Sequence, residues 1–193
     1  MRSTEFDRSE VLHNAMQTFM EHGYAKSSMQ KLTSATGLHP GSIYCAFGSK
    51  KGLFVEAINY YQTQKRKEFM ALFDDKTPVL NSLKALIDSV VAQCLDDSCA
   101  KVCLLTQSLN EMGNHDPQIK AMLSENLQHI EQQLALHIMN AQKQGEGIRD
   151  DCPLTLARFV SLGLYGLRTY AYTHQDKAIL KAMGDQLLLS IKS

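Results

Sequence analysis

Apolar residues recur at spacings of three and four along almost the whole chain, and this pattern constrains the fold more than any other feature. Such spacing places apolar side chains on one face of an α-helix. No sustained alternation of Val, Ile or Thr with polar residues indicates β-strands. With 44% hydrophobic and 21% charged residues, the chain has enough apolar material for a folded core. The sequence therefore predicts an all-α protein.

Glycine, proline and capping residues divide this pattern into separate helices. Gly23 and Gly37 stand where helices end, Ser28 and Ser49 stand where helices begin, and Pro40 suits a first helical turn. We expect helices over about 7–22, 28–36, 40–47, 50–73, 78–95, 100–112, 116–144, 153–173 and 176–191.

Charge is distributed unevenly although 20 Lys and Arg balance 20 Asp and Glu. Residues 1–67 hold nine basic and five acidic residues, a net charge of +4, and the remainder carries −4. This asymmetry favours an N-terminal module that faces a polyanion. No apolar run approaches the roughly 20 residues of a membrane helix, and the first residues lack the apolar core of a secretory signal. We expect a cytoplasmic protein that does not enter a membrane.

Cysteine usage and motifs speak against a metalloprotein or an enzyme. The five cysteines are odd in number and lack CxxC spacing, so we expect no disulfide framework, no metal site and no cofactor. Phosphate-binding glycine loops, GxSxG, HExxH and paired carboxylate motifs are absent from the sequence. The sequence therefore predicts a protein without catalytic activity.

Two short predicted helices flank Gly37-Leu38-His39 and match a helix-turn-helix, whose second helix enters the DNA major groove. Spacing alone fits an ordinary helical protein equally well. The residue types are more specific. Gly23-Tyr24-Ala25 and the run GSIYxxFxSK from Gly41 to Lys50 stand at the spacing of one known domain.

Over residues 7–54 the chain resembles the N-terminal domain of TetR/AcrR-family regulators. The resemblance implies a DNA-binding domain over residues 1–54, with its motif at about 28–47, and a helical effector-binding and dimerisation domain over 55–193. It also implies a homodimer that binds a palindromic operator in double-stranded DNA. The protein would then be a repressor that a small-molecule effector releases from this operator.

Candidate DNA contacts follow from chemistry and from the resemblance. Ser28 caps a helix whose N-terminus suits a phosphate, Gln30 can reach a base edge, and Lys31 can reach a phosphate. The resemblance adds residues of the recognition helix and one lysine after it: Pro40, Gly41, Ser42, Tyr44, Cys45 and Lys50. Because this helix has few base-reading donors, we expect specificity to rest on thymine methyl groups, Gln30 and DNA shape.

The C-terminal domain offers candidate effector and dimer contacts. Polar, aromatic and thiol groups on otherwise apolar helix faces are effector candidates: Gln93, Cys103, Gln107, Asn110, Phe159, Tyr165 and Arg168. Apolar stripes with two glycines on the last two helices are dimer candidates: Val160, Gly163, Leu164, Leu167, Met183, Leu187 and Ile191. The same stripes would also suit the core of a single protomer.

Two alternatives stay open. The first is a thiol-based repressor that senses oxidants or electrophiles, because Cys99 and Cys103 lie four residues apart. The second alternative is a helical interaction adaptor that does not bind DNA.

Overall fold

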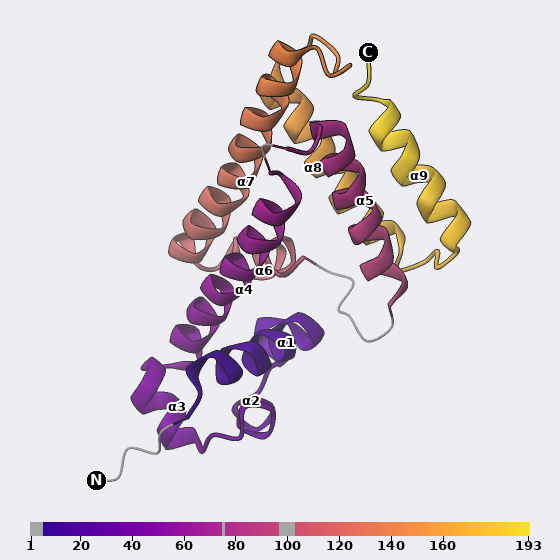
Figure 1. Ribbon diagram of the computed structural model, residues 1–193. Coiled ribbons are helices and arrows are strands. Elements are labelled where there is room, and N and C mark those ends of the chain that lie inside the picture. The colour runs from indigo at the N-terminus through magenta and orange to yellow at the C-terminus, as the bar shows by residue number, and fades with distance from the viewer. Residues whose placement is uncertain (1–5, 75, 97–102) are drawn as a thin grey trace. The chain divides into compact units, whose positions relative to one another are not determined.

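The computed structural model describes residues 6–74, 76–96 and 103–193. The described residues form helices with short connections (Figure 1), and their one β-contact is an isolated bridge between Ile148 and Lys192. The prediction of an all-α fold is confirmed. The helices are α1 (Arg8–Lys26), α2 (Met29–Thr36), α3 (Pro40–Phe47), α4 (Lys50–Leu72), α5 (Val79–Leu95), α6 (Leu104–Met112), α7 (Pro117–Gln144), α8 (Pro153–Tyr170) and α9 (Lys177–Leu189).

Local chemistry explains where the N-terminal helices begin and end. The carboxylate of Asp7 accepts the N–H groups of Ser9 at 2.8 Å and Glu10 at 3.2 Å, which caps α1. Ser28 caps α2 by accepting the Lys31 N–H at 3.2 Å. Gly37 ends α2 with a φ of 69°, in the left-handed region that glycine enters without a steric penalty.

The predicted helices agree with the structure to within a few residues at their ends. The largest difference within a described helix is at the end of α1, which continues past a break at Gly23 to Lys26 rather than ending at residue 22. Helix α8 stops at Tyr170 rather than Thr173. The predicted start at residue 100 lies outside the described residues. On α2, Ala35 is exposed, and Thr36 is buried with its hydroxyl donating to the Leu32 carbonyl at 2.7 Å.

The chain divides into two compact units. The first comprises residues 1–66 and 104–123, and the second comprises 67–103 and 124–193. The unit that holds the helix-turn-helix therefore extends beyond residue 54 and includes α6 and the first turns of α7. Helices α4 and α7 each contribute residues to both units.

In the first unit, α1 packs against α2 and α6, and α2 packs against α3. Its core contains Phe19, Leu32, Ile43, Leu53 and Phe54, each exposed by 1% or less. Burying such a side chain contributes about 1.5 to 3 kcal/mol, so these residues hold the three N-terminal helices on α4.

In the second unit, α5, α8 and α9 pack against one another. The core is formed by apolar residues of these helices and of α7, among them Leu83, Ile138, Val160, Leu180 and Ile191. Glu146 also caps α5, because its carboxylate accepts the Val79 N–H at 2.6 Å. Among the described residues, no helix is long and apolar enough to cross a membrane.

Candidate DNA-binding interface and effector site

The turn between α2 and α3 leaves one face of α3 open. Ile43 and Phe47 are buried and hold α3 on the first unit, as the sequence predicts. Tyr44 is 50% exposed, and Pro40, Gly41 and Cys45 are exposed beside it. About half of the Tyr44 side chain therefore reaches solvent, and its contact with DNA stays a prediction.

The beginning of α2 is also accessible. Ser28, Gln30 and Lys31 are exposed, and Ser42 of α3 is partly exposed. The N–H groups of the first turn of α2 lack carbonyl partners within the helix and suit a phosphate. The predicted DNA contacts on α2 and α3 therefore reach solvent; that they touch DNA stays a prediction.

Lys50 differs from a lysine that extends into solvent. Its Nζ lies 4.4 Å from the centroid of the Tyr24 ring and 3.5 Å from the Ala25 carbonyl oxygen. Burial lowers the pKa of Lys50, and the nearby Glu111 carboxylate opposes that shift. Lys50 thus has internal partners that the sequence pattern does not reveal, and its phosphate contact stays a prediction.

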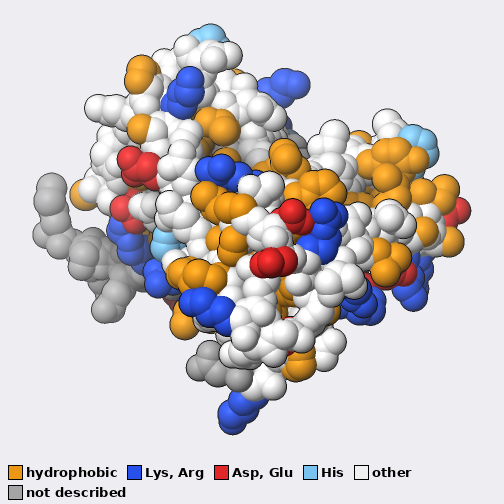
Figure 2. Space-filling view, turned by 90° about the horizontal axis from the view of Figure 1, so that it is seen from above, with side chains coloured by type: hydrophobic (Ala, Val, Ile, Leu, Met, Phe, Trp, Pro, Cys, Tyr) orange, Lys and Arg blue, Asp and Glu red, His pale blue; other side chains and the backbone are white. Residues whose placement is uncertain are grey.

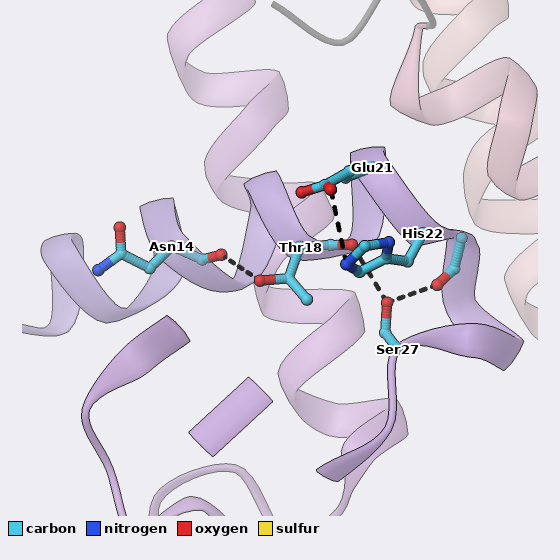
Figure 3. A network of polar contacts seen from close by, with 6 residues as sticks. Asn14, Thr18, Glu21, His22 and Ser27 are labelled. Carbon is cyan, nitrogen blue, oxygen red and sulfur yellow. Dashed lines mark hydrogen bonds and ion pairs between the residues drawn. The ribbon is translucent and has the colours of Figure 1, made fainter. Parts of the chain in front are cut away.

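The turn between α1 and α2 is held by a buried hydroxyl. The Ser27 hydroxyl lies 2.6 Å from the Gly23 carbonyl oxygen and 3.2 Å from that of Thr18, and Figure 3 shows these contacts below the end of α1. The Thr18 hydroxyl in turn donates to the Asn14 carbonyl at 2.9 Å. This network fixes the chain where it enters α2.

An open pocket lies next to the end of α3. It is lined by residues of α1, the end of α3, the α3–α4 turn and the start of α4: Arg8, Ala46, Phe47, Ser49, Lys51, Gly52, Val55 and Glu56. Arg8 crosses it, with its guanidinium 3.3 Å from a Glu56 carboxylate oxygen and 4.8 Å from the Phe47 ring centroid. This pocket belongs to the first unit and is not the effector pocket that the sequence predicts among later helices.

Several effector candidates come together in the second unit. The guanidinium of Arg168 donates to the Gln93 side-chain oxygen at 2.8 Å, which joins α8 to α5. Burial strongly raises the pKa of the Tyr165 hydroxyl, Cys103 and Glu131 raise it further, and Arg168 opposes them. Gln93, Cys103, Tyr165 and Arg168 thus form a partly buried polar group.

The remaining effector candidates are Gln107, Asn110 and Phe159. Gln107 and Asn110 belong to the first unit, and Phe159 is 47% exposed on α8. The side-chain oxygen of Gln107 is buried without a hydrogen-bond partner. Four of the seven predicted effector residues therefore form one polar group, and the effector contacts of the other three stay predictions.

The predicted dimer contacts need correction. Val160, Leu167, Leu187 and Ile191 are at most 8% exposed within a single protomer. Gly163 serves the same core, since a Cβ there would lie 2.5 Å from the methyl groups of Leu187. A helical stripe cannot distinguish a protomer's own core from a partner's surface, and here most of the stripe is core.

Other apolar residues of α8 and α9 remain at the surface. Phe159, Leu162, Ile179, Met183 and Leu189 are each between 42% and 67% exposed. Hydrophobic side chains gather at the right of Figure 2, the side on which Figure 1 draws α9. Of the predicted dimer contacts, only Met183 belongs to this exposed set, whereas Leu164 is partly buried.

The cysteines are distributed over both units. Cys45 and Cys152 are exposed, Cys94 is buried and Cys103 is intermediate. Cys99 lies outside the described residues, so its predicted proximity to Cys103 stays a prediction. Among the described residues, no group of three or more His, Cys, Asp or Glu side chains is arranged to hold a metal.

Glu111 is the main feature of this region that the sequence pattern misses. It lies on α6 and accepts two backbone N–H groups from the last turn of α1, those of Tyr24 at 2.7 Å and Ala25 at 2.6 Å. A partner 87 positions away leaves no local signal in the sequence.

Comparison with known proteins agrees with this geometry. Residues 11–57 match the family described as bacterial regulatory proteins, tetR family. The HTH-type transcriptional regulator YezE of Bacillus subtilis is 29% identical over 91% of each chain. The HTH-type transcriptional repressor ComR of Escherichia coli is 27% identical over 86% of this chain and 80% of its own.

Solved structures extend the likeness to the whole fold. A cysteine mutant of the TetR family transcriptional regulator CifR, complexed with 26-base-pair operator DNA, is 26% identical, covers 98% of this chain and 99% of its own, and has a TM-score of 0.85. The reduced form of Escherichia coli NemR has a TM-score of 0.84 at 14% identity, with 96% of both chains covered, and shows the fold alone. The helix-turn-helix, the family match and the shared fold lead to one conclusion: residues 11–57 form a DNA-binding domain of the tetR family, and the chain as a whole is similar to TetR family transcriptional regulators.

Proposed function

We propose that the protein is a repressor that binds a palindromic operator as a homodimer and leaves it when a small molecule binds. The main support for this proposal is the exposed face of α3, which follows the turn at Gly37. This face contains Pro40, Gly41, Tyr44 and Cys45. CifR, a structural relative with the same fold, is bound to operator DNA. The proposal assigns no catalytic activity and places the protein in the cytoplasm, where DNA is accessible.

In this proposal α3 enters the major groove and the start of α2 contacts the phosphate backbone. Tyr44 and the small residues beside it meet base edges and sugar-phosphate groups, and Lys31 neutralises a phosphate. A palindromic operator presents two such grooves about 34 to 36 Å apart, one helical turn, and so requires two reading heads.

The exposed apolar residues of α8 and α9 support dimerisation. A contiguous apolar face on a soluble protein commonly marks an interaction surface. Two helices from each protomer would form a four-helix interface with two-fold symmetry. We assign this face to Phe159, Leu162, Ile179, Met183 and Leu189 in place of the buried residues of the same helices.

For the effector, we propose an amphipathic or aromatic molecule that contacts the group formed by Gln93, Cys103, Tyr165 and Arg168. Polar groups among apolar helix faces orient such ligands and provide specificity. Linkage requires operator DNA to weaken effector binding by the factor by which the effector weakens DNA binding.

A thiol sensor is the second candidate, favoured by the position of Cys103 beside Tyr165. It predicts that peroxide or an electrophile releases DNA and that Cys103→Ser abolishes this response. Retention of the response in that variant would remove Cys103 from the mechanism.

Footprinting of the intergenic DNA beside the protein's own gene tests the proposal. We expect protection of a palindrome and retarded migration that an unrelated duplex does not compete away. A helical adaptor without DNA binding would leave the DNA unprotected.

A further inference from the structure

The last residues of α1, after the break at Gly23, begin a new helical turn without a local cap. Gly23 interrupts α1 with φ 75° and ψ 171°, and Tyr24 to Lys26 then return to helical conformation. The first N–H groups of such a turn have no carbonyl partner behind them. In Figure 3 the imidazole of His22 points to Glu21, at 3.8 Å, and so does not cap this turn.

Glu111 supplies the missing acceptor from α6. Its two carboxylate oxygens each accept one of the adjacent N–H groups of Tyr24 and Ala25, at 2.7 and 2.6 Å. Bonds this short are typical of charge-assisted hydrogen bonds, and a carboxylate at a helical N-terminus is also favoured by the helix dipole. Glu111 is therefore a cap provided by a distant helix.

Gly23 permits this approach. A Cβ at residue 23 would lie 2.7 Å from a carboxylate oxygen of Glu111, and the positive φ of Gly23 disfavours any side chain there. The turn thus has the backbone conformation and the space that the carboxylate needs.

The segment from Glu111 to Asp116 also contacts the start of α4. Asp116, which caps α7 through the N–H groups of Gln118 and Ile119, lies 2.5 Å from the ammonium of Lys51. Lys50, the next residue towards α3, has its ammonium over the Tyr24 ring. The stretch from Glu111 to Asp116 therefore contacts the chain just before α2 and just after α3.

We propose that Glu111, supported by Asp116, is a positioning residue for DNA binding: it fixes the turn that leads into α2 and so sets the pose of α2 and α3. Neither residue lies in the helix-turn-helix, and neither is among the predicted DNA contacts. This inference rests on the proposed function as a DNA-binding regulator.

Whether the loss of the Glu111 charge strengthens or weakens DNA binding distinguishes a positioning role from simple electrostatic repulsion of DNA. Removing a negative charge close to a DNA-binding face should strengthen binding to phosphates. Loss of positioning should weaken it. Glu111→Gln keeps the shape of the side chain but retains one acceptor oxygen for two N–H groups, so we expect the operator dissociation constant to rise about tenfold, within the range of a charge-assisted hydrogen bond.

Matched variants complete the experiment. Glu21→Gln removes the same charge from an exposed residue near the same turn, and we expect operator binding equal to or tighter than wild type. Glu111→Asp keeps the charge but is one methylene shorter, and we expect weakened binding there too. Stoichiometric titration gives the active fraction of each variant, so that loss of folded protein is counted separately from a change in affinity.

Amide hydrogen exchange on the free protein gives a second measurement that needs no DNA. In Glu111→Gln we expect about tenfold faster exchange at Tyr24 and Ala25 and faster exchange across residues 29–47, with no such change in Glu21→Gln. If the wild-type protein binds no DNA sequence in preference to another, the proposed function is overturned. The hydrogen-exchange rates would then be the test of the positioning role. Unchanged exchange across residues 29–47, or unweakened operator binding by both Glu111 variants, would overturn this inference.

Discussion

Gly163 of α8 faces Leu187 of α9 so closely that a Cβ on the glycine would lie 2.5 Å from both leucine methyl groups. Leu187 is 8% exposed and belongs to the core of the second unit. The glycine thus permits α8 and α9 of one protomer to pack together. By contrast, a Cβ on Gly166 would meet open space.

The first prediction concerns this contact. Gly163→Ala should lower the free energy of unfolding by about 1 kcal/mol, because overpacking costs about 1 to 3 kcal/mol and exceeds the gain in helix propensity. In a Leu187→Ala background, which provides space, the same change should be stabilising. Urea unfolding measures both effects, with Gly166→Ala as a control that should gain up to about 1 kcal/mol. Equal effects of Gly163→Ala in the two backgrounds would refute the contact.

The second prediction places the dimer interface on exposed residues. Leu162 is 67% exposed, so Leu162→Glu should leave the protomer folded and convert the dimer into a monomer in light scattering. Leu187→Glu should instead unfold the protomer, because it places a charge in the core. A folded dimer for both Leu162→Glu and Met183→Glu would exclude this face.

The third prediction concerns acid stability. The hydrogen bond from Lys51, followed by the N–H of Ile119, lowers the pKa of Asp116 below its ordinary value of 3.8. Such a carboxyl stabilises the fold above its unfolded pKa, and the stabilisation is lost as pH falls through the folded value. Asp116→Asn should therefore be less stable than wild type at pH 6, and the difference should shrink below about pH 4. Urea unfolding between pH 3 and 7 measures it; a difference independent of pH would contradict the ion pair.

A fourth prediction concerns Cys152, which is exposed at the start of α8. The backbone N–H of Thr155, then its hydroxyl and the N–H of Leu154, lower the pKa of the Cys152 thiol. Since the thiolate is the reactive form, iodoacetamide should alkylate Cys152 at a lower pH in the native protein than in urea-unfolded protein. Mass spectrometry of the labelled peptide follows the reaction. Identical pH profiles in the two states would show that the helix start does not activate this thiol.

The helices were predictable because their ends are signalled locally. Gly37 has a left-handed φ, Ser28 caps α2 by accepting the Lys31 N–H, and Pro40 begins α3. These signals act within a few positions, so the sequence alone predicts the bounds of α2 and α3 and the face of α3 that is exposed.

The remaining contacts were not predictable because they join distant positions. Glu111 contacts a turn 87 residues earlier, and no pattern near Gly23 indicates an acceptor on α6. The stripe of Val160 and Leu187 has helical spacing whether it packs on its own protomer or on a partner. Only tertiary structure distinguishes these cases.

The most direct test of DNA reading by α2 and α3 is the salt dependence of operator binding, measured by fluorescence anisotropy with the footprinted duplex. Lys31→Gln should weaken binding to operator and random DNA alike and reduce the slope of log affinity against log salt by about one. Tyr44→Phe removes a hydroxyl and no charge, so it should weaken operator binding while leaving that slope unchanged. Wild-type affinity and slope in both variants would contradict the assignment of this face to DNA.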